Sequence, residues 1–575
     1  MITPLGEGTE RNLEAVLRGE SRLQRYTSVH GETVPEPFVG SLFEILPERA
    51  GYTPFEALCI AAAEGAIREA PTDVTAEDCV FVLSTTKGNI WSSPAESAHK
   101  IAEFFGNHTT PVVVSTACTS GVSAQLTAYR LLSAGIYRTA VLIGCDVQSR
   151  FVVSGFQSFK ALSPEVCRPF DAERQGLNAG EAAAAMVLQT DGLEGSRSAR
   201  SLSSSKSSRS SNLRVASDDR QSRVSSLRSW TLLGGSIHND ANHISGPSRT
   251  AEGSLRCLQD ALALLPADSL ACVSVHGTGT AYNDEMESIA LHRAGLEETP
   301  VSALKGFYGH TMGAAGLMET ILTIHALNRG LVLPTRGFAH KGTTYPVNVS
   351  PEVRTTEKRA FVKLLSGFGG VNAAVAWTGG SPATTEDTEK RETQVINEVR
   401  VDGTHGPNGP NGTNGTNGAK DDIVGRYRVL GVAYPKFFKM DTLCRLGFVA
   451  VEELLRGHEE QIDAEHTALI LANRSASLKN DKDYQATIAD PENYFPSPAL
   501  FVYTLPNIVT GELAIRHGLY GETAFYVLEK EDDLLPIVEA TLREPQIRSA
   551  IVGWVECSAA DNYEAHVKLV EGVKE

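Results

Sequence analysis

The chain has 575 residues, of which 42% are hydrophobic and 21% are charged, and its formal net charge is -17. This length exceeds that of one ordinary domain, and the composition is typical of a soluble globular protein. The excess of acidic residues is spread over the chain, which argues against nucleic acid or an anionic membrane as a main partner. No apolar run has the length that spans a bilayer, and the N-terminal segment does not have the pattern of a signal peptide.

The cysteines are scattered singly along the chain. They form no CxxC pair and no dense framework, so we interpret them as reduced thiols and predict a cytoplasmic protein. The sequence also lacks the short CxxC and HxxxH spacings of zinc ligands, and no metal or other cofactor is expected. The nine cysteines stand at positions 59, 79, 118, 145, 167, 257, 272, 444 and 557.

In chain order, short runs rich in Val, Ile, Leu and Ala alternate with helical stretches. Residues 123–135 and 316–330 have helical spacing, and each stretch ends on a glycine. Strands that alternate with helices of this length predict an α/β protein whose sheets are largely buried. Patterns of buried strands lie at 139–147, 184–190, 271–279 and 373–379.

Two segments have low sequence complexity. The first, at about 195–229, is rich in Ser and Arg and predicts a disordered surface loop, because it has too little apolar surface to order itself. RNA binding or phosphorylation of this tract is an alternative, but a tolerated insertion is favoured. The second is rich in Gly, Asn, Pro and Thr and, with the polar stretch before it, predicts a flexible linker over 381–423. This linker divides the chain into domains at 1–380 and 424–575.

A faint internal repeat connects the two domains. A strand, a Ser-Pro-Ala step and a helix ending in Phe105-Gly106 precede Cys118, and the same order, ending in His517-Gly518, follows the linker. Counted from these glycines, Lys530 stands in the second copy where Cys118 stands in the first. The last domain is therefore interpreted as a partial copy of the first one that has no thiol.

Cys118 lies in the segment VVVSTACTSGVSAQ, between a β-branched run and a helical run. A strand-to-helix elbow would expose the thiol at a helix N-terminus, where N–H groups and the helix dipole lower a thiol pKa and favour nucleophilic attack. Free cysteines are also common as small buried hydrophobes. These residues alone leave both interpretations open.

Two histidines lie downstream in loops of small residues. His276 follows a predicted strand in SVHGTGTAYNDEMES, where Thr278 and Thr280 lie within hydrogen-bonding reach on the same loop. His310 precedes a helix in LKGFYGHTMGAAGLMET, which begins next to Lys305. A single histidine is usually structural, and a cysteine-protease dyad would need one histidine rather than two. A further glycine-rich turn, SGFGGVNAA, lacks the spacing of a phosphate-binding loop.

The motifs TACTSG, HGTGTAYND, KGFYGHTMGAAG and GFGGVN, in this order, resemble those of the β-ketoacyl-acyl-carrier-protein synthases. These are condensing enzymes of the thiolase fold. The segment ALSPEVCRPFDAERQGLNAGEAAAAMVL fits the family's stretch between the cysteine and the first histidine. The resemblance covers roughly residues 2 to 380 and implies two related α/β halves in an α-β-α-β-α layering. Each motif alone is moderately specific, whereas the ordered set is highly specific.

The resemblance implies an acyltransferase that catalyses a decarboxylative Claisen condensation. Cys118 would accept an acyl chain from an acyl carrier protein, and His276 and His310 would bind the carbonyl of a malonyl unit and promote its decarboxylation. Neutral imidazoles suit this role, because two donors can stabilise an enolate oxygen. The backbone N–H groups of Cys118 and Phe368 would form the oxyanion hole.

The remaining site residues are also implied by the resemblance. Lys305, paired with Glu319, would tune the histidine site, and Thr278 and Thr280 would contact the phosphopantetheine arm. Asp284 is the acidic residue that matches the family in the same loop.

Two departures from the family pattern affect these expectations. Near the gating turn the chain reads LLSGFGGVN where the family has Asn-Ser-Phe-Gly-Phe-Gly-Gly-Thr-Asn, so acyl-chain selection is not predicted. In addition, the family's first strand, which is expected deep in the sheet, would end where this chain begins.

Residues 424–575 resemble an N-terminal half of the same fold without a second set of histidine motifs, as in the synthase-like proteins of aryl-polyene and flexirubin pigment clusters. The predicted function is elongation of a fatty acid, polyene or polyketide. The alternative is a non-catalytic partner like a chain-length factor, or a scaffold for another synthase. A thiolase would need a second cysteine late in the chain, and SGFGGVN contains none. Expected partners are an acyl carrier protein and, by resemblance, a second copy of the chain or a synthase-like subunit.

Overall fold

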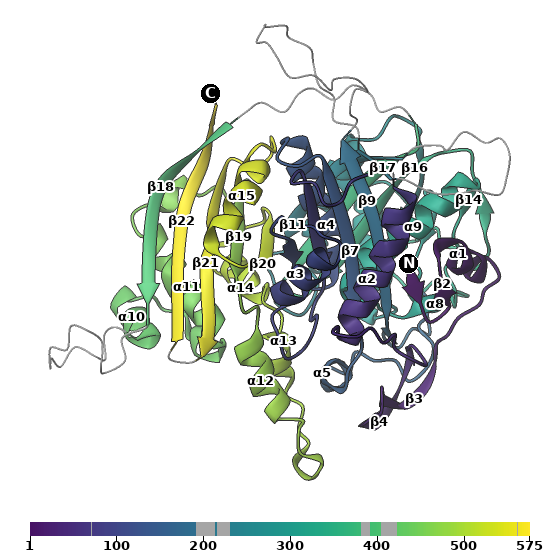
Figure 1. Ribbon diagram of the computed structural model, residues 1–575, viewed down its shortest axis with the longest axis horizontal. Helices are drawn as coiled ribbons and strands as arrows, with labels where there is room; N and C mark the ends of the chain where they lie inside the picture. Colours follow the sequence, from purple (N-terminus) through teal and green to yellow (C-terminus); the bar gives the residue numbers. More distant parts are fainter. Residues whose placement is uncertain are drawn as a thin grey trace, which may run out of the picture.

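The computed structural model describes residues 1–70, 72–190, 213–215, 230–380, 391–403, 422–559 and 562–574. Two parts lie side by side (Figure 1): an N-terminal unit of residues 1–380 and a C-terminal unit of residues 391–574, drawn in green to yellow. The predicted Ser/Arg-rich loop lies outside the described residues, except for the short strand β10 (Leu213–Val215). No helix in the described part of the chain has the length and apolar character needed to cross a membrane.

The N-terminal unit contains two runs of paired strands that β10 connects, since it pairs with β9 and β11. In the first run β5 pairs in parallel with β6 and β7, and β7 pairs antiparallel with β9. In the second run β17 pairs antiparallel with β11 and β16, and β12 pairs in parallel with β16 and β13. The strands of the first run are β5 (Cys79–Ser84), β6 (Val112–Val114), β7 (Thr139–Asp146) and β9 (Ala182–Thr190). Those of the second run are β11 (Thr231–Asn239), β12 (Leu270–Ser274), β13 (Val301–Ser302), β16 (Ala360–Gly367) and β17 (Val371–Thr378).

Helices form three layers around these strands, in the α-β-α-β-α order that the sequence predicts. The outer helices α2 and α3 cover the first run, and α6 and α7 cover the second. The middle helices α4 and α9 are buried on almost every side because both runs of strands pack on them. The outer helices are α2 (Pro54–Glu69), α3 (Pro94–Phe104), α6 (Glu252–Ala263) and α7 (Ala281–Arg293), and the middle ones are α4 (Ser120–Ser133) and α9 (Ala315–Asn328).

The two middle helices cross with their backbones in contact. A Cβ atom on Gly121 of α4 would lie 2.9 Å from the backbone of Gly316 in α9, and one on Gly316 would lie 2.5 Å from the backbone of Gly121. Gln125 fastens the crossing by donating to the carbonyl of Gly316 at 3.2 Å. Side chains larger than hydrogen do not fit at this crossing, so the first turns of both helices are brought to the same place.

The C-terminal unit continues the first run of strands. Its strand β20 pairs antiparallel with β6, with Tyr526 opposite Val114 and Val527 opposite Val113. From β20 the hydrogen-bonded order continues through β19, β21, β22 and β18. The strands are β18 (Arg391–Asp402), β19 (Thr467–Asn473), β20 (Thr523–Val527), β21 (Ser549–Ala559) and β22 (Asn562–Lys574).

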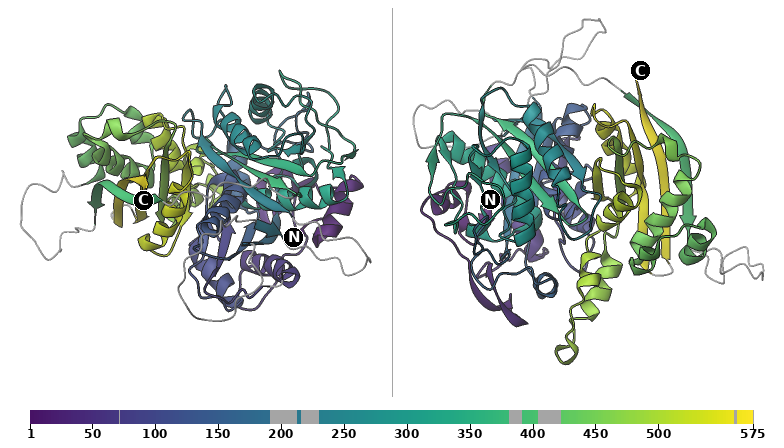
Figure 2. Two further views of the ribbon diagram at one scale, coloured as in Figure 1. Left: turned by 90° about the horizontal axis from the view of Figure 1, so that it is seen from above. Right: turned by 180° about the vertical axis from the view of Figure 1, so that it is seen from behind.

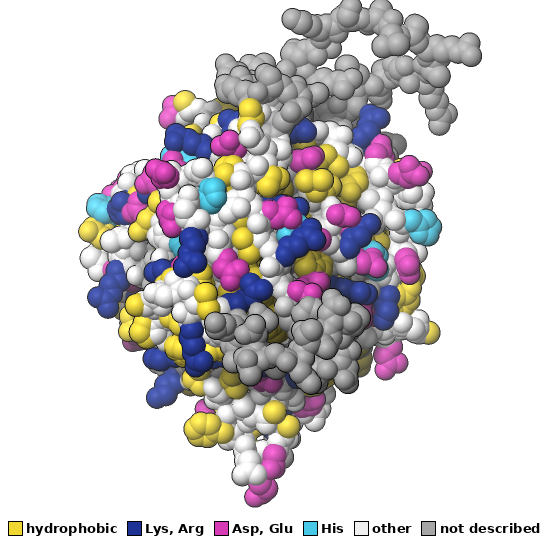
Figure 3. Space-filling view, turned by 90° about the vertical axis from the view of Figure 1, so that its left-hand side faces the viewer, with side chains coloured by type: hydrophobic (Ala, Val, Ile, Leu, Met, Phe, Trp, Pro, Cys, Tyr) yellow, Lys and Arg dark blue, Asp and Glu magenta, His cyan; other side chains and the backbone are white. Residues whose placement is uncertain are grey.

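The C-terminal unit has helices on both faces of its strands. On one face α11 (Thr442–Leu455) and α14 (Ile508–His517) cover the strands, while α15 (Leu535–Leu542) packs against α4 of the N-terminal unit. The view from above in Figure 2 shows the two units in contact along this junction. On the coloured part of the outer face in Figure 3, Lys and Arg side chains are interspersed with Asp and Glu, so neither sign dominates there.

The prediction of a flexible linker over 381–423 is wrong for residues 391–402. They form β18, which pairs antiparallel with β22, for example Val399 with Val567. Although the segment is mostly polar, its apolar residues recur towards one face, where Val401 is fully buried. Residues 381–390 and 404–421 lie outside the described part of the chain.

Buried ion pairs cross between the two units. Arg130 of α4 donates two hydrogen bonds to Glu522, at 2.7 and 2.8 Å, and both side chains are only 3% exposed. Lys87 donates to Asp481 at 2.8 Å, and these side chains are also buried. Isolated charges at these depths would be strongly destabilising, so each unit supplies the counter-charge that the other needs.

We predict that Arg130→Ala lowers the free energy of unfolding by about 3–5 kcal/mol, because it leaves the Glu522 carboxylate buried without its partner. Urea denaturation followed by tryptophan fluorescence measures this. The matched control is Arg256→Ala, which removes an ion pair across the same junction, with Glu465 at 2.8 Å, whose carboxylate is half exposed. The control should cost about 0–1 kcal/mol, and equal losses in the two variants would contradict the prediction.

Candidate active site

Cys118 lies at an elbow between β6 and α4. After β6 the backbone of Ala117 adopts a left-handed conformation, with φ of 52°, and a 3-10 turn, η1 (Ala117–Thr119), leads into α4. The hydroxyl of Ser120 accepts a hydrogen bond from the Thr116 N–H at 2.9 Å and closes the elbow. A positive φ at a residue other than glycine is strained and is held by the surrounding structure. The sequence-predicted elbow is therefore present, with the thiol at the start of a central helix.

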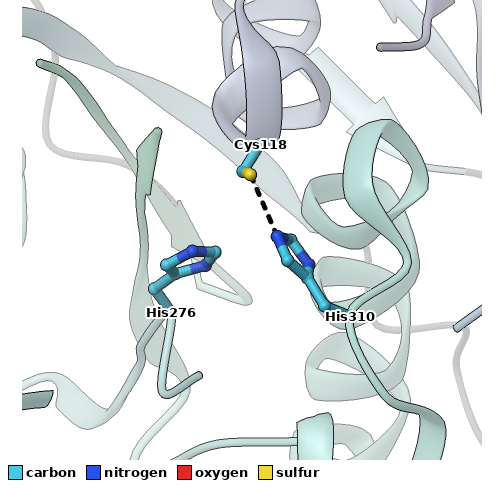
Figure 4. Close-up of side chains that lie close together, drawn as sticks. All are labelled: Cys118, His276 and His310. Atoms are coloured by element: carbon cyan, nitrogen blue, oxygen red, sulfur yellow. Dashed lines mark hydrogen bonds between the residues drawn. The ribbon is translucent and has the colours of Figure 1, made fainter. Parts of the chain in front are cut away.

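The two predicted histidines lie beside this thiol. Nε2 of His310 is 2.9 Å from Sγ of Cys118, and the rings of His276 and His310 are 5.0 Å apart between centroids and nearly perpendicular. Figure 4 shows both rings facing the space below Cys118, one from the loop after β12 and one from the loop before α9. Residues separated by up to 192 positions in the chain thus form one cluster.

Hydrogen bonds decide which nitrogen of His310 carries its proton. The N–H of Met312 donates to Nδ1 of His310 at 3.3 Å, so a neutral ring holds its proton on Nε2, which points at Cys118. Nδ1 of His276 is buried and has no hydrogen-bond partner among the described residues. Burial, with the charge of Lys305 in second place, holds the pKa of both imidazoles well below the usual range, so both rings are neutral at pH 7.

A fully buried group of charges lies behind the histidines. Nζ of Lys305 donates to the carbonyl of His276 at 2.6 Å and to Glu319 at 3.0 Å, so the expected pair of Lys305 and Glu319 is present. Glu319 also accepts from Lys363 of β16. Burial opposes ionisation of Glu319, but the two lysines together lower its pKa below the usual value. We refer to Lys305, Glu319 and Lys363 as the buried charge triad.

The sequence reasoning missed Lys363. It is fully buried and donates to the carbonyl of Val275, directly before His276, at 3.1 Å. The available signal was a single lysine inside the apolar strand AFVKLLSG, because a buried strand rarely carries a charge without a counter-charge.

Two buried carboxylates shape the His276 loop. Glu287 of α7 accepts from the N–H groups of His276 and Gly277 at 2.6 and 2.7 Å. Asp284 accepts from the N–H groups of Thr278 and Gly279 at 3.0 and 3.1 Å. Burial raises the pKa of Glu287 to about 7. Asp284 thus lies where the family pattern implies, whereas Glu287 was not singled out from the sequence.

The two predicted substrate-binding threonines share this loop. The hydroxyls of Thr278 and Thr280 are hydrogen-bonded to each other at 2.8 Å, and Thr278 is buried while Thr280 is half-buried. Their contact with a phosphopantetheine arm stays a prediction.

Asp146 is a second residue that sequence reasoning missed. It is buried at the end of β7, where it accepts from the hydroxyl of Thr85 at 2.7 Å and from the N–H of Gly313 at 2.7 Å. Gly313 precedes α9 and follows His310 closely, so Asp146 attaches the His310 loop to the first run of strands. No motif marked this residue, because the segment TAVLIGCDV reads as an ordinary buried strand.

The predicted gating turn around Phe368 also reaches the thiol. It connects β16 and β17, and a Cβ atom on Gly367 would lie 3.3 Å from the backbone nitrogen of Cys118. Phe368 is half-buried, and its ring lies 5.6 Å from that of Phe159 between centroids. The turn is thus placed beside Cys118, as its expected part in an oxyanion hole requires.

The structure contradicts the sequence-based expectation for the protonation state of the Cys118 thiol. The helix N-terminus predicts a lowered pKa, but burial raises the pKa of Cys118 to about 12, and the charge of Lys305 offsets this only in part. The thiol is therefore protonated at pH 7 in the resting site.

Sγ of Cys118 and ring nitrogens of His276 and His310 lie within 4.8 Å of one another, a spacing that could hold a metal ion. The expectation that the site works without a metal stays a prediction. A half-buried thiol, two neutral imidazoles that face it and a nearby backbone turn on a five-layered α/β fold suit the class of site that handles thioesters.

Comparison with known proteins agrees with this class. Residues 38–192 match the family model "Beta-ketoacyl synthase, N-terminal domain" and residues 231–339 match "Beta-ketoacyl synthase, C-terminal domain". The chain is 30% identical over 276 residues to a 3-oxoacyl-[acyl-carrier-protein] synthase 2 of Rhizobium meliloti, covering 46% of this chain and 59% of that protein. It is 27% identical over 308 residues to nodulation protein E of Rhizobium leguminosarum bv. trifolii, covering 52% and 70%. The matched part thus spans about three fifths to seven tenths of these relatives.

A solved structure named "PfaC Keto synthase-Chain length factor" superposes on 99% of this chain and 77% of its own, with a TM-score of 0.71 and 13% identity. This identity shows the fold alone. The N-terminal unit thus matches both domains of the beta-ketoacyl synthase family, and the expected thiolase-like fold is confirmed.

We predict that alkylation of Cys118 by iodoacetamide becomes about tenfold faster per pH unit between pH 7 and pH 9. The reason is that only the thiolate reacts and its fraction rises tenfold per unit below a pKa of about 12. Mass spectrometry of the labelled peptide gives the rate, and Cys118→Ala sets the background. A plateau by pH 8 would show a thiol of lowered pKa instead.

Proposed function

We propose that this chain is a β-ketoacyl-acyl-carrier-protein synthase, which condenses a malonyl unit with an acyl chain bound to Cys118. The observation that carries the proposal is the cluster of Cys118, His276 and His310, with Nε2 of His310 2.9 Å from Sγ. The match of the N-terminal unit to both domains of this family supports the same chemistry.

The first half-reaction transfers the acyl chain. Sγ of Cys118 attacks the thioester carbonyl, the bond to the pantetheine sulfur breaks, and that sulfur takes up the proton that Cys118 loses. Because the resting thiol is protonated, the proton must leave as the new bond forms. The N–H on Nε2 of His310 and the first turn of α4 both stabilise negative charge on Sγ at that stage. The N–H groups of Cys118 and Phe368 are proposed to bind the carbonyl oxygen as it becomes anionic.

The second half-reaction uses the histidines. When the malonyl thioester loses carbon dioxide, the electron pair of the broken C–C bond moves into an enolate whose oxygen is negative. Neutral imidazoles that donate N–H groups stabilise this oxygen, and the lowered pKa of His276 and His310 keeps them neutral. The enolate carbon then attacks the acyl carbonyl on Cys118, and Sγ leaves. The product is a β-ketoacyl thioester on the carrier protein.

The buried charge triad sets the electrostatics of this step. Lys305 and Lys363 place positive charge behind the two imidazoles, where it favours an anionic intermediate and disfavours protonation of the rings. Glu319 neutralises part of that charge, which lowers the energetic cost of burying the two lysines in the core. None of the three needs to react.

We propose that the C-terminal unit acts as a built-in, non-catalytic partner. It pairs with β6, the strand that leads to Cys118, and the similarity of the whole chain to a keto synthase–chain length factor protein supports this role. In this unit β20 is followed by a short 3-10 turn (Glu531–Leu534) and α15, in the order of β6, η1 and α4, with the exposed Lys530 at the position that corresponds to Cys118.

Since β5 and β20 occupy both edges of β6, a homodimer through this strand is not available to the folded chain. A cytoplasmic location and an acyl carrier protein as partner are part of the same proposal, supported by nine free cysteines and by the named relative. The alternative of a wholly non-catalytic partner is disfavoured, because thiol and both imidazoles are assembled.

The test is incubation with octanoyl-carrier protein, followed by intact-protein mass spectrometry. We expect one octanoyl adduct on Cys118, with no adduct on Cys118→Ala. Malonyl-carrier protein is then assayed for release of carbon dioxide. Absence of the adduct in the unsubstituted chain, or release of carbon dioxide without any condensation product, would refute the proposal.

His276→Ala separates the two half-reactions. We expect the rate of decarboxylation to fall by two to three orders of magnitude, as for loss of one oxyanion donor, while Cys118 is still acylated. Thr343→Ala is the control, since its buried hydroxyl donates to the carbonyl of Tyr345 rather than into the cluster. Unchanged decarboxylation in His276→Ala would remove this histidine from the mechanism.

A further inference from the structure

The gating turn is held by a residue of the C-terminal unit. Nδ2 of Asn507 donates a hydrogen bond to the carbonyl of Phe368 at 2.8 Å, and the Asn507 side chain is buried. Asn507 immediately precedes α14, which lies at the junction of the two units in Figure 1. The turn that the N-terminal unit presents to Cys118 is therefore attached to the other unit.

The turn and α14 are in backbone contact. A Cβ atom on Gly511 of α14 would lie 2.6 Å from the carbonyl oxygen of Gly369, and one on Gly369 would lie 2.6 Å from Nδ2 of Asn507. Gly369 also has φ of 92°, which a larger residue would adopt only with strain. The turn and the helix therefore lie too close together for larger side chains at Gly369 and Gly511.

A second hydrogen-bonded bridge makes the same connection. Nδ2 of Asn239, at the end of β11, donates to the carbonyl of Gly369 at 2.9 Å and to the hydroxyl of Thr523 in β20 at 3.0 Å. The carbonyls of Phe368 and Gly369 are thus bound by side-chain amides at the junction. The N–H of Gly369 donates to the carbonyl of Ile244 at 2.6 Å.

The other half of the Asn507 amide makes no bond. Its Oδ1 atom is buried and has no hydrogen-bond partner among the described residues. A buried polar atom without a hydrogen-bond partner is destabilising, so the Asn507 side chain lowers the stability of the fold through its Oδ1 atom. The hydrogen bond from the same amide to the Phe368 carbonyl fixes the position of the turn.

We propose that Asn507 is a positioning residue, supplied by the C-terminal unit, that holds the Phe368 turn in place for acyl transfer to Cys118. This rests on the proposed function, in which the N–H of Phe368 binds the thioester oxygen. Decarboxylation uses His276 and His310, which Asn507 does not touch. Loss of Asn507 therefore slows the first half-reaction and leaves the second.

The test compares variants of the full chain. Single-turnover transfer of an octanoyl group from carrier protein to Cys118 is expected to slow by on the order of 10- to 100-fold in Asn507→Ala, because a misplaced oxyanion donor loses much of its effect. Asn507→Asp keeps the shape but loses the donor, and it should be at least as slow. Gly511→Ala, which pushes against the carbonyl of Gly369, should also slow transfer.

Two other rates separate positioning from loss of structure. Decarboxylation of malonyl-carrier protein and alkylation of Cys118 by iodoacetamide should stay within about twofold of the unsubstituted chain. The matched control is Asn480→Ala, which removes another buried amide of the C-terminal unit, one that donates to the carbonyl of Leu500 at 2.9 Å. Its acyl transfer should stay within about twofold, whatever its melting temperature.

The outcomes distinguish the two proposals. Acyl transfer at the parent rate in Asn507→Ala overturns the positioning role while the proposed function stands. A parallel fall of all three rates, matched by Asn480→Ala, also overturns it, because a structural role then suffices. An unsubstituted chain that takes no octanoyl group refutes the proposed function, and the role of Asn507 falls with it.

Discussion

The crossing of α4 and α9 is the constraint on which the site depends. Gly121 and Gly316 let the two backbones touch, so the first turns of both helices lie at one point in the middle layer. Cys118 precedes one helix and His310 precedes the other, and this is why residues so far apart in the chain come within 2.9 Å. Ala117 and Met312, just before each helix, both have positive φ, at 52° and 49°. A strained left-handed residue thus precedes both helices, one beside the thiol and the other beside the imidazole.

The charges around this point suit the imidazoles to the proposed role of hydrogen-bond donors. Neither ring of the pair is bonded to a carboxylate among the described residues, and Nδ1 of His310 instead accepts a backbone N–H. Lysines lie behind both rings, so protonation is opposed by burial and by like charge together. A carboxylate partner would raise the imidazole pKa and suit a general base. The buried charge triad does the opposite and suits stabilisation of an anion.

Much of this site could be predicted from the sequence, because its residues stand in short motifs with glycines at fixed places. Cys118, His276, His310 and the pair of Lys305 and Glu319 all come together as those motifs imply. The layers of the N-terminal unit follow from apolar runs whose length and period distinguish strands from helices.

The residues that sequence reasoning missed share a physical cause. Lys363, Glu287 and Asp146 act through contacts across the sheet or between elements, and such partners are set by tertiary packing rather than by neighbours in the chain. Strand β18 was missed for a similar reason, since its polar segment becomes a strand only when β22 lies beside it. The thiol pKa was predicted in the wrong direction, because the local helix signal says nothing about depth of burial.

The C-terminal unit would need neither a thiol nor histidines for the partner role that we propose. The strand β6 has only three residues, and without β20 its second edge would be an unpaired row of backbone groups next to the nucleophile. A partner strand in the same chain is always present, whatever the protein concentration. In that role the C-terminal unit acts on the neighbouring site through β20, which pairs with β6, and through Asn507 before α14, which binds the Phe368 turn. A non-catalytic partner does not need a thiol at the position that corresponds to Cys118, and the exposed Lys530 stands there.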